Sequence, residues 1–187
     1  MTAYLETNLL PLMLSINAKQ TESHILAALG LDERVSPQSI LIAFGERIER
    51  FWNQVISDSN ANNLIEETNL LDVNDRQRQI DHLFEIDGQN YYLESKCNLN
   101  FDSEKIRASN DKVNAIRDTI GGNVCAAYFV PVVPTVSSAE QTKYANKGMN
   151  VWGVNDMLSV INAPFTSDEY FTFLREVVAP ILEEKGL

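Results

Sequence analysis

Histidine and cysteine are scarce in this sequence, since the 187-residue chain has two of each. Cys97 and Cys125 each lie in an apolar run without a C-x-x-C pattern, and neither His24 nor His82 has the spacing of a metal ligand. These residues argue against a zinc site. We therefore expect two buried thiols, as is usual for free cysteine, in the reducing cytoplasm.

Long apolar runs are also lacking. No run approaches the roughly 20 residues that a membrane-spanning helix needs. The apolar stretch at residues 9–16 is short, contains Pro11 and follows Glu6 rather than a basic region, which is not the pattern of a signal peptide. We expect a cytoplasmic protein that makes no contact with a membrane.

The sequence also has no excess of basic residues. The formal net charge of −11 argues against a protein that coats nucleic acid. The segment from Arg76 to Arg117 differs from the rest, because its seven basic residues balance seven acidic ones. Divalent cations held by some of these carboxylates would make the surface locally positive. The composition is therefore compatible with a local nucleic-acid site and predicts weak non-specific binding.

Hydrophobic periodicity predicts an α/β chain, a mixed sheet flanked by helices on both faces with an N-terminal helical region. We expect a single domain over 1–187, with the helical region at 1–35, the core at 36–160 and a C-terminal helix at 161–187. The predicted elements are a helical stretch at 4–30 ending near Gly30, a helix opened by Ser36-Pro37, strands at 80–86 and 91–97 joined by an Asp87-Gly88 turn, a helix at 102–120, a strand at 123–133, a helix at 138–146, a strand at 150–154 and a helix after Thr166 that kinks or ends near Pro180.

Three charged residues converge on the predicted hairpin. Glu94 and Lys96 are two residues apart on one strand and so share a face. Asp81 lies on the partner strand, and the short turn places it across the ladder from Glu94. His82 alternates with Asp81 and therefore points to the opposite face, where we expect a buried, hydrogen-bonded side chain.

Two neighbouring carboxylates repel unless a cation lies between them. Mg²⁺ is suited to this position because it takes hard oxygen ligands from one or two carboxylates, and Mn²⁺ is expected to substitute for it. A nearby lysine can orient a water molecule or offset the charge of a phosphoryl transition state. The alternative is a solvated sheet face with cross-strand charge pairs of little energetic value, but the apolar residues around these charges argue against it.

At this point the chain resembles the PD-(D/E)XK nuclease superfamily, the fold of many restriction endonucleases. The resemblance rests on Ile80-Asp81, the hairpin, Glu94-Ser95-Lys96 and the helix and strand that follow, over roughly residues 37–155. The usual proline before the aspartate is replaced by Ile80, and the first strand of the family core has only a candidate at 62–73. The resemblance implies a restriction-endonuclease-like fold in which Asp81, Glu94 and Lys96 are catalytic and the two carboxylates bind the metal.

Further residues come from the same resemblance. The segment from Gly45 to Glu49 is similar to the first core helix, which makes Glu49 the first candidate for an additional metal ligand and Glu46 the second. A solvated helix face is the alternative for both. Lys105 and Lys112 are seven apart on one helix face and are candidates for binding DNA phosphates, with an exposed helix face again as the alternative. If Lys105 and Lys112 do not bind DNA, the next candidate for the DNA-binding surface is the region near Lys143 and Lys147.

The expected function is hydrolysis of phosphodiester bonds in double-stranded DNA by a Mg²⁺-dependent endonuclease of the type II restriction kind. A repair or junction-resolving nuclease of the same fold is the first alternative, although such enzymes usually carry a more basic surface. A DNA-binding or assembly protein that uses the fold without cleavage is the second. A homodimer would match the two-fold symmetry of duplex sites. The recognition sequence and the cut pattern do not follow from the residues.

Overall fold

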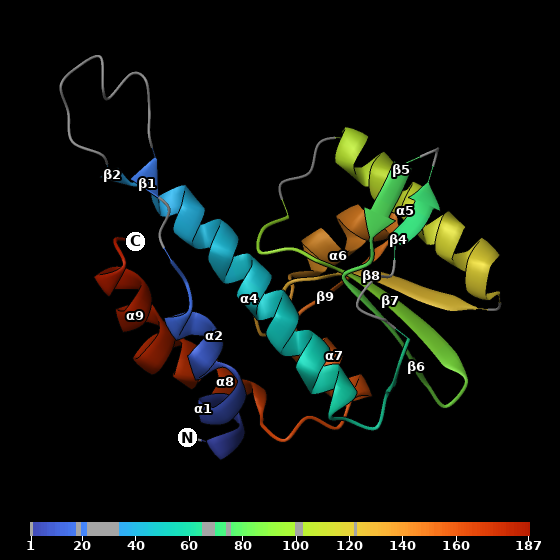
Figure 1. Ribbon diagram of the computed structural model, residues 1–187. Helices are drawn as coiled ribbons and strands as arrows, with labels where there is room; N and C mark the ends of the chain where they lie inside the picture. The colour runs from blue at the N-terminus through green and yellow to red at the C-terminus, as the bar shows by residue number, and fades with distance from the viewer. Residues whose placement is uncertain are drawn as a thin grey trace, which may run out of the picture. The chain divides into compact units, whose positions relative to one another are not determined.

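This computed structural model describes residues 2–17, 20–21, 34–64, 70–73, 76–99, 103–121 and 123–187. Its main sheet has five strands, is mixed and is flanked by helices (Figure 1). The coarse prediction of an α/β chain with a mixed sheet is confirmed. The chain divides into two compact units: Met1–Trp52 with Asp168–Leu187 forms unit 1, and Asn53–Ser167 forms unit 2.

The sheet belongs to unit 2 and has the strand order β3-β6-β7-β8-β9. Its strands are β3 (Asn62–Asn63), β6 (His82–Ile86), β7 (Gln89–Ser95), β8 (Val124–Phe129) and β9 (Asn150–Trp152). The pairs β3·β6 and β6·β7 are antiparallel, whereas β7·β8 and β8·β9 are parallel. The predicted hairpin turn is confirmed: Asp87 and Gly88 have φ angles of 51° and 79°, and two successive positive values match the twist of the flanking strands.

Two helices pack on the face of the sheet that carries Glu94. The parallel step from β7 to β8 requires a crossover, which is supplied by α5 (Ser103–Ile120), and α6 (Ser138–Ala145) connects β8 to β9. Apolar residues of both helices join the sheet in one buried cluster, which includes Leu83, Tyr92, Val113, Ile116, Ala126, Tyr128, Tyr144 and Val151. On α5, Ile106, Val113 and Ile116 are buried against the sheet, whereas Ile120 at the end of the helix is exposed.

The opposite face of the sheet holds the buried histidine. His82 is fully buried, and its Nδ1 lies 2.7 Å from Oδ1 of Asn53. Its ring meets Phe129 edge to face. The predicted inward orientation of His82 is therefore confirmed. After β9 the chain forms α7 (Val154–Val160), a helix that the sequence analysis missed.

A separate two-stranded ribbon lies beside α5. It consists of β4 (Leu70–Val73) and β5 (Arg76–Gln79), which pair antiparallel, and β4 contacts α5. The candidate first strand at 62–73 is therefore only partly right, since within the described residues only Asn62 and Asn63 join the main sheet.

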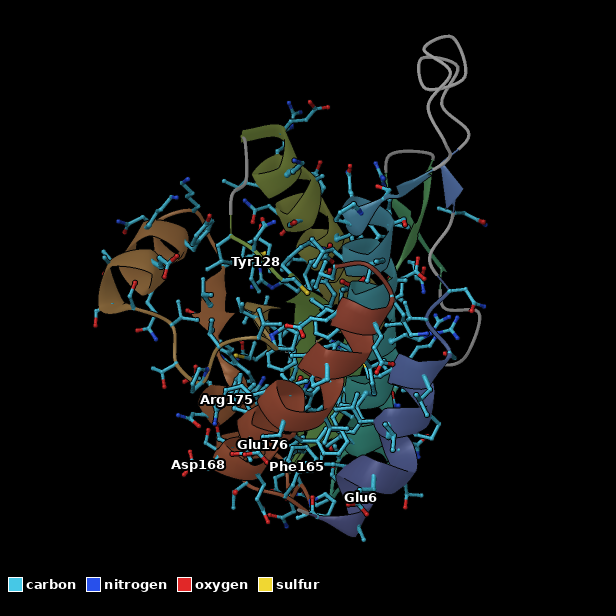
Figure 2. All side chains as sticks on the ribbon, turned by 90° about the vertical axis from the view of Figure 1, so that its left-hand side faces the viewer. Glu6, Tyr128, Phe165, Asp168, Arg175 and Glu176 are labelled. Carbon is cyan, nitrogen blue, oxygen red and sulfur yellow. The ribbon has the colours of Figure 1, made fainter. Side chains whose placement is uncertain are left out.

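Unit 1 is formed by α1 (Ala3–Asn8), α2 (Leu10–Leu14), β1 (Gln20–Thr21), β2 (Arg34–Val35), most of α4 (Pro37–Ser57), α8 (Ser167–Phe173), a π-helical turn (Leu174–Val178) and α9 (Ala179–Glu184). Its core is aromatic: Trp52 donates from Nε1 to the hydroxyl of Tyr170, and Phe51 stacks on the same tyrosine. On the C-terminal helical segment, Asp168, Arg175 and Glu176 are exposed (Figure 2).

Several boundaries differ from prediction. The expected helix at 4–30 breaks into α1 and α2 and ends at Leu14, while residues 22–30 lie outside the described ones. The expected strand at 123–133 ends at Phe129. The C-terminal helix continues beyond Pro180, and the irregularity precedes that residue as the π-helical turn. Within the described residues, no helix has the length and apolarity to span a membrane.

The expectation of two buried thiols is wrong. Both cysteines are free, with Cys97 exposed and Cys125 half-buried. Cys97 lies beyond the end of β7, where the alternation that buries neighbouring side chains has stopped. An apolar sequence context therefore did not determine burial here.

Candidate active site

Strand register brings the two candidate carboxylates together. β6 pairs with β7 so that His82 lies opposite Leu93, and one further step places Asp81 opposite Glu94. Asp81 is in the bend immediately before β6 rather than within the strand. Its Oδ2 accepts a hydrogen bond of 2.9 Å from the backbone nitrogen of Ser95. This bond fixes the Asp81 carboxylate against the end of β7.

Lys96 binds both carboxylates. Its Nζ lies 2.8 Å from Oε1 of Glu94 and 3.7 Å from Oδ2 of Asp81. The residue follows the last residue of β7, and its backbone nitrogen donates to the carbonyl of Phe129 at 2.8 Å, which holds it against β8. The structure thus brings together the three residues that sequence reasoning selected.

Two further residues contact the Glu94 carboxylate. Lys112 on α5 approaches Oε2 with its Nζ at 2.5 Å, and Tyr92 donates its hydroxyl hydrogen to the same oxygen. Tyr92 was not among the predicted site residues, although it lies two residues before Glu94 on the same strand face. Lys112 was a candidate for contact with phosphate. Within this structure Lys112 instead has a side chain only 12% exposed and is paired with Glu94.

Asp81, Glu94, Lys96 and Lys112 line a pocket of about 560 Å³. Its charged lining consists of Arg78, Lys96, Lys105, Lys112, Asp81 and Glu94, and its neutral lining includes Cys97, Asn98, Ser109 and Tyr128 (Tyr128 is labelled in Figure 2). Among the described lining residues, four cations face two carboxylates, although the whole chain carries a net charge of −11. The pocket is therefore a positively charged region of an acidic protein.

Burial and neighbouring charges shift the two carboxyl groups in opposite directions. Burial raises the pKa of Asp81, and the negative charge of Glu94 raises it further. Burial also acts to raise the pKa of Glu94, but the ammonium groups of Lys112 and Lys96 outweigh it and lower that pKa overall. Two interacting carboxyls with opposite shifts are a frequent feature of functional sites.

A divalent cation fits this site in part. Asp81 Oδ1 accepts no hydrogen bond from the described residues, whereas both Glu94 oxygens are already bound by cations. Two hard carboxylate oxygens suit Mg²⁺, which keeps several waters when few protein ligands are present. In the part of the chain that the structure describes, no three His, Cys, Asp or Glu side chains form a metal-binding group. The donor set is therefore the pair Asp81 and Glu94.

The remaining predicted site residues are Glu46 and Glu49 on α4 and Lys105 on α5. Glu46 and Glu49 are on α4 in unit 1, where Glu46 is exposed and its Oε2 lies 3.7 Å from Nη1 of Arg47, while Glu49 is half-buried. A metal-binding role for Glu49 stays a prediction. Lys105 is exposed and lines the pocket, so it does share a pocket-facing side of α5 with Lys112, as their spacing indicated.

Comparisons with models of known protein families and with curated proteins found no match to this chain.

Proposed function

We propose that this protein is a divalent-metal-dependent nuclease that hydrolyses phosphodiester bonds of DNA, with Asp81, Glu94 and Lys96 as its catalytic residues. The observation that carries the proposal is the joint contact of Lys96 with two opposed carboxylates in a positively charged pocket. The positive lining favours an anionic substrate, and buried carboxylates favour a metal cofactor. The restriction-endonuclease-like fold is part of this proposal and agrees with the mixed sheet and its crossover helix.

Each residue has a separate role in the proposed reaction. Asp81 Oδ1 and Glu94 would hold Mg²⁺, or Mn²⁺ in its place. When bound, the metal supplies polarisation of the phosphate and a water of lowered pKa. Lys96 Nζ orients the attacking water and offsets charge on the phosphoryl oxygens. Attack by the water oxygen forms one phosphorus–oxygen bond as the bond to the leaving oxygen breaks. The attacking water releases one proton to solvent, and a solvent water returns one proton to the leaving oxygen.

The test is incubation of purified protein with supercoiled plasmid and Mg²⁺, followed by gel electrophoresis. We expect cleavage by the wild type and a loss of at least about 100-fold in rate for Asp81→Asn, Glu94→Gln and Lys96→Met. Glu104→Gln is the matched control, since Glu104 is an exposed carboxylate on α5. Thermal unfolding of each variant separates a chemical effect from loss of the fold. Undiminished cleavage by any of the three folded site variants would remove that residue from the mechanism.

The pattern of products tests the biological class. Discrete fragments indicate a sequence-specific enzyme of the type II restriction kind, whereas a smear indicates a nuclease without sequence preference. Analytical sedimentation tests whether the protein is the homodimer expected of such a restriction enzyme. A branched DNA substrate tests the repair or junction-resolving alternative.

A second candidate function, a DNA-binding protein that does not cleave, is favoured by one observation. Glu94 is already neutralised by Lys96 and Lys112, so the pocket is able to accept phosphate without a metal. Binding of duplex DNA in excess chelator, with no cleavage in Mg²⁺ or Mn²⁺, would support this function over the nuclease.

A further inference from the structure

Lys112 occupies a position that a phosphate-binding lysine on an open helix face would not. Its side chain is 12% exposed, and its ammonium bridges Glu94 Oε2 at 2.5 Å and the carbonyl oxygen of Gln79 at 3.0 Å. The two acceptors come from β7 and β5, so the contact joins the sheet, the ribbon and α5. Such a placement gives Lys112 a role at the carboxylate pair itself.

The Glu94 carboxylate has little capacity for a further cation while Lys112 stays in place. Oε1 is bound by Lys96, and Oε2 receives both Lys112 and the hydroxyl of Tyr92. A divalent ion bound to Oε2 would also lie close to the ammonium of Lys112, and like charges repel strongly in a buried site. Asp81 Oδ1 accepts no hydrogen bond from the described residues and is the more available ligand atom, but a single carboxylate oxygen is a weak Mg²⁺ site.

We propose that Lys112 is a built-in cation that holds Glu94 in the metal-free protein, competes with the divalent metal for it, and binds the substrate phosphate once the metal displaces it. The inference rests on the proposed nuclease function and deepens it by coupling metal binding to phosphate binding. The lysine that stabilises Glu94 in the metal-free protein thereby supplies a positive charge for the substrate when the metal binds.

The competition predicts opposite effects of one substitution on two ligands. Lys112→Met removes the ammonium and keeps most of the apolar stem. We expect it to tighten Mn²⁺ binding by about tenfold, because the competing charge is gone. In Ca²⁺, the same variant should bind duplex DNA about fivefold more weakly, because a phosphate contact is lost. Lys112→Arg keeps the charge and should not tighten Mn²⁺ binding.

Lys105→Met is the matched control. Lys105 lies on the same helix and lines the same pocket but is exposed. It should leave Mn²⁺ affinity within about twofold of the wild type, since screening weakens the effect of an exposed charge. If Lys105→Met and Lys112→Met tighten Mn²⁺ binding equally, the effect comes from the overall charge of the pocket. That result would overturn the proposed competition between Lys112 and the metal.

Mn²⁺ affinity is measured without DNA, from the loss of the free-ion electron paramagnetic resonance signal on titration of the full chain. Tighter binding by Lys112→Met supports the inference even if plasmid cleavage fails. Unchanged Mn²⁺ affinity in folded Lys112→Met overturns the inference and leaves the nuclease proposal standing. Absence of Mn²⁺ binding in both proteins overturns the inference together with the metal-dependent mechanism. A circular dichroism melt confirms that each variant is folded.

Discussion

The buried histidine makes the stability of unit 2 depend on pH in a predictable way. Burial lowers the pKa of His82 from 6.5 to about 3, because a charged imidazole would have to leave water. The negative charge of Glu94 opposes this shift and the positive charge of Lys96 adds to it, and the value of about 3 includes both. The ring is therefore neutral in the folded protein at any pH above about 3.

The sign of the effect follows from proton binding. Between pH 6.5 and about 3 the unfolded chain protonates His82 and the folded chain does not. Stability contributed by the neutral buried ring is thus fully present above pH 6.5 and is lost as pH falls through this window. From pH 7.5 to 5.0 the loss amounts to about 2 kcal/mol, since each unit below the unfolded pKa is worth about 1.4 kcal/mol.

The assay is urea unfolding followed by circular dichroism, at pH 7.5 and 5.0, for the wild type and His82→Gln. With a denaturant slope of about 2 kcal/mol per molar urea, the wild-type midpoint should fall by about 1 M. His82→Gln should lack this part of the shift, because glutamine does not titrate. Both proteins contain the same carboxylates, so the difference between their midpoint shifts isolates the contribution of His82. The reasoning is refuted if the variant and the wild type show the same midpoint shift.

Three other changes have expected outcomes. Tyr92→Phe removes a buried hydroxyl that donates to a carboxylate, and should destabilise the protein by about 1.5 kcal/mol in urea unfolding at pH 7.5. Gly153→Ala should cost about 1–3 kcal/mol in the same assay, because the added Cβ would lie 2.6 Å from the backbone oxygen of Pro134. If α4 supplies a metal ligand, Glu49→Gln should lower the rate of cleavage at limiting Mg²⁺ by about tenfold, whereas Glu46→Gln, at an exposed position, should not. Wild-type cleavage rates in both variants would exclude a metal ligand from α4.

Local patterns were sufficient for the hairpin and for the identity of its charged residues. Alternation between polar and apolar positions placed Asp81 and His82 on opposite sides, and the Asp87-Gly88 turn set the register that brings Asp81 opposite Glu94. Both depend on backbone geometry within a few residues. For the same reason, the spacing of Lys105 and Lys112 correctly indicated that they share one side of α5.

Local patterns failed where the outcome depended on the limits of an element. In the described part of residues 4–30 the helical structure ended at Leu14, and Cys97 is exposed because β7 had already ended at Ser95. Helix and strand ends depend on competing tertiary contacts as well as on propensity, so an apolar context does not locate them.

The sequence by itself determined the strand-turn-strand unit, the amphipathic helix α5 and the pairing of Asp81 with Glu94, since these follow from side-chain periodicity and turn chemistry. Only the tertiary structure decided what lies over that pair. Packing of Val113 and Ile116 against the sheet sets the rotation of α5 and directs Lys112 to Glu94, a residue 18 positions away. Periodicity shows which residues share a helix face, but the surface that the face meets depends on how helix and sheet pack together.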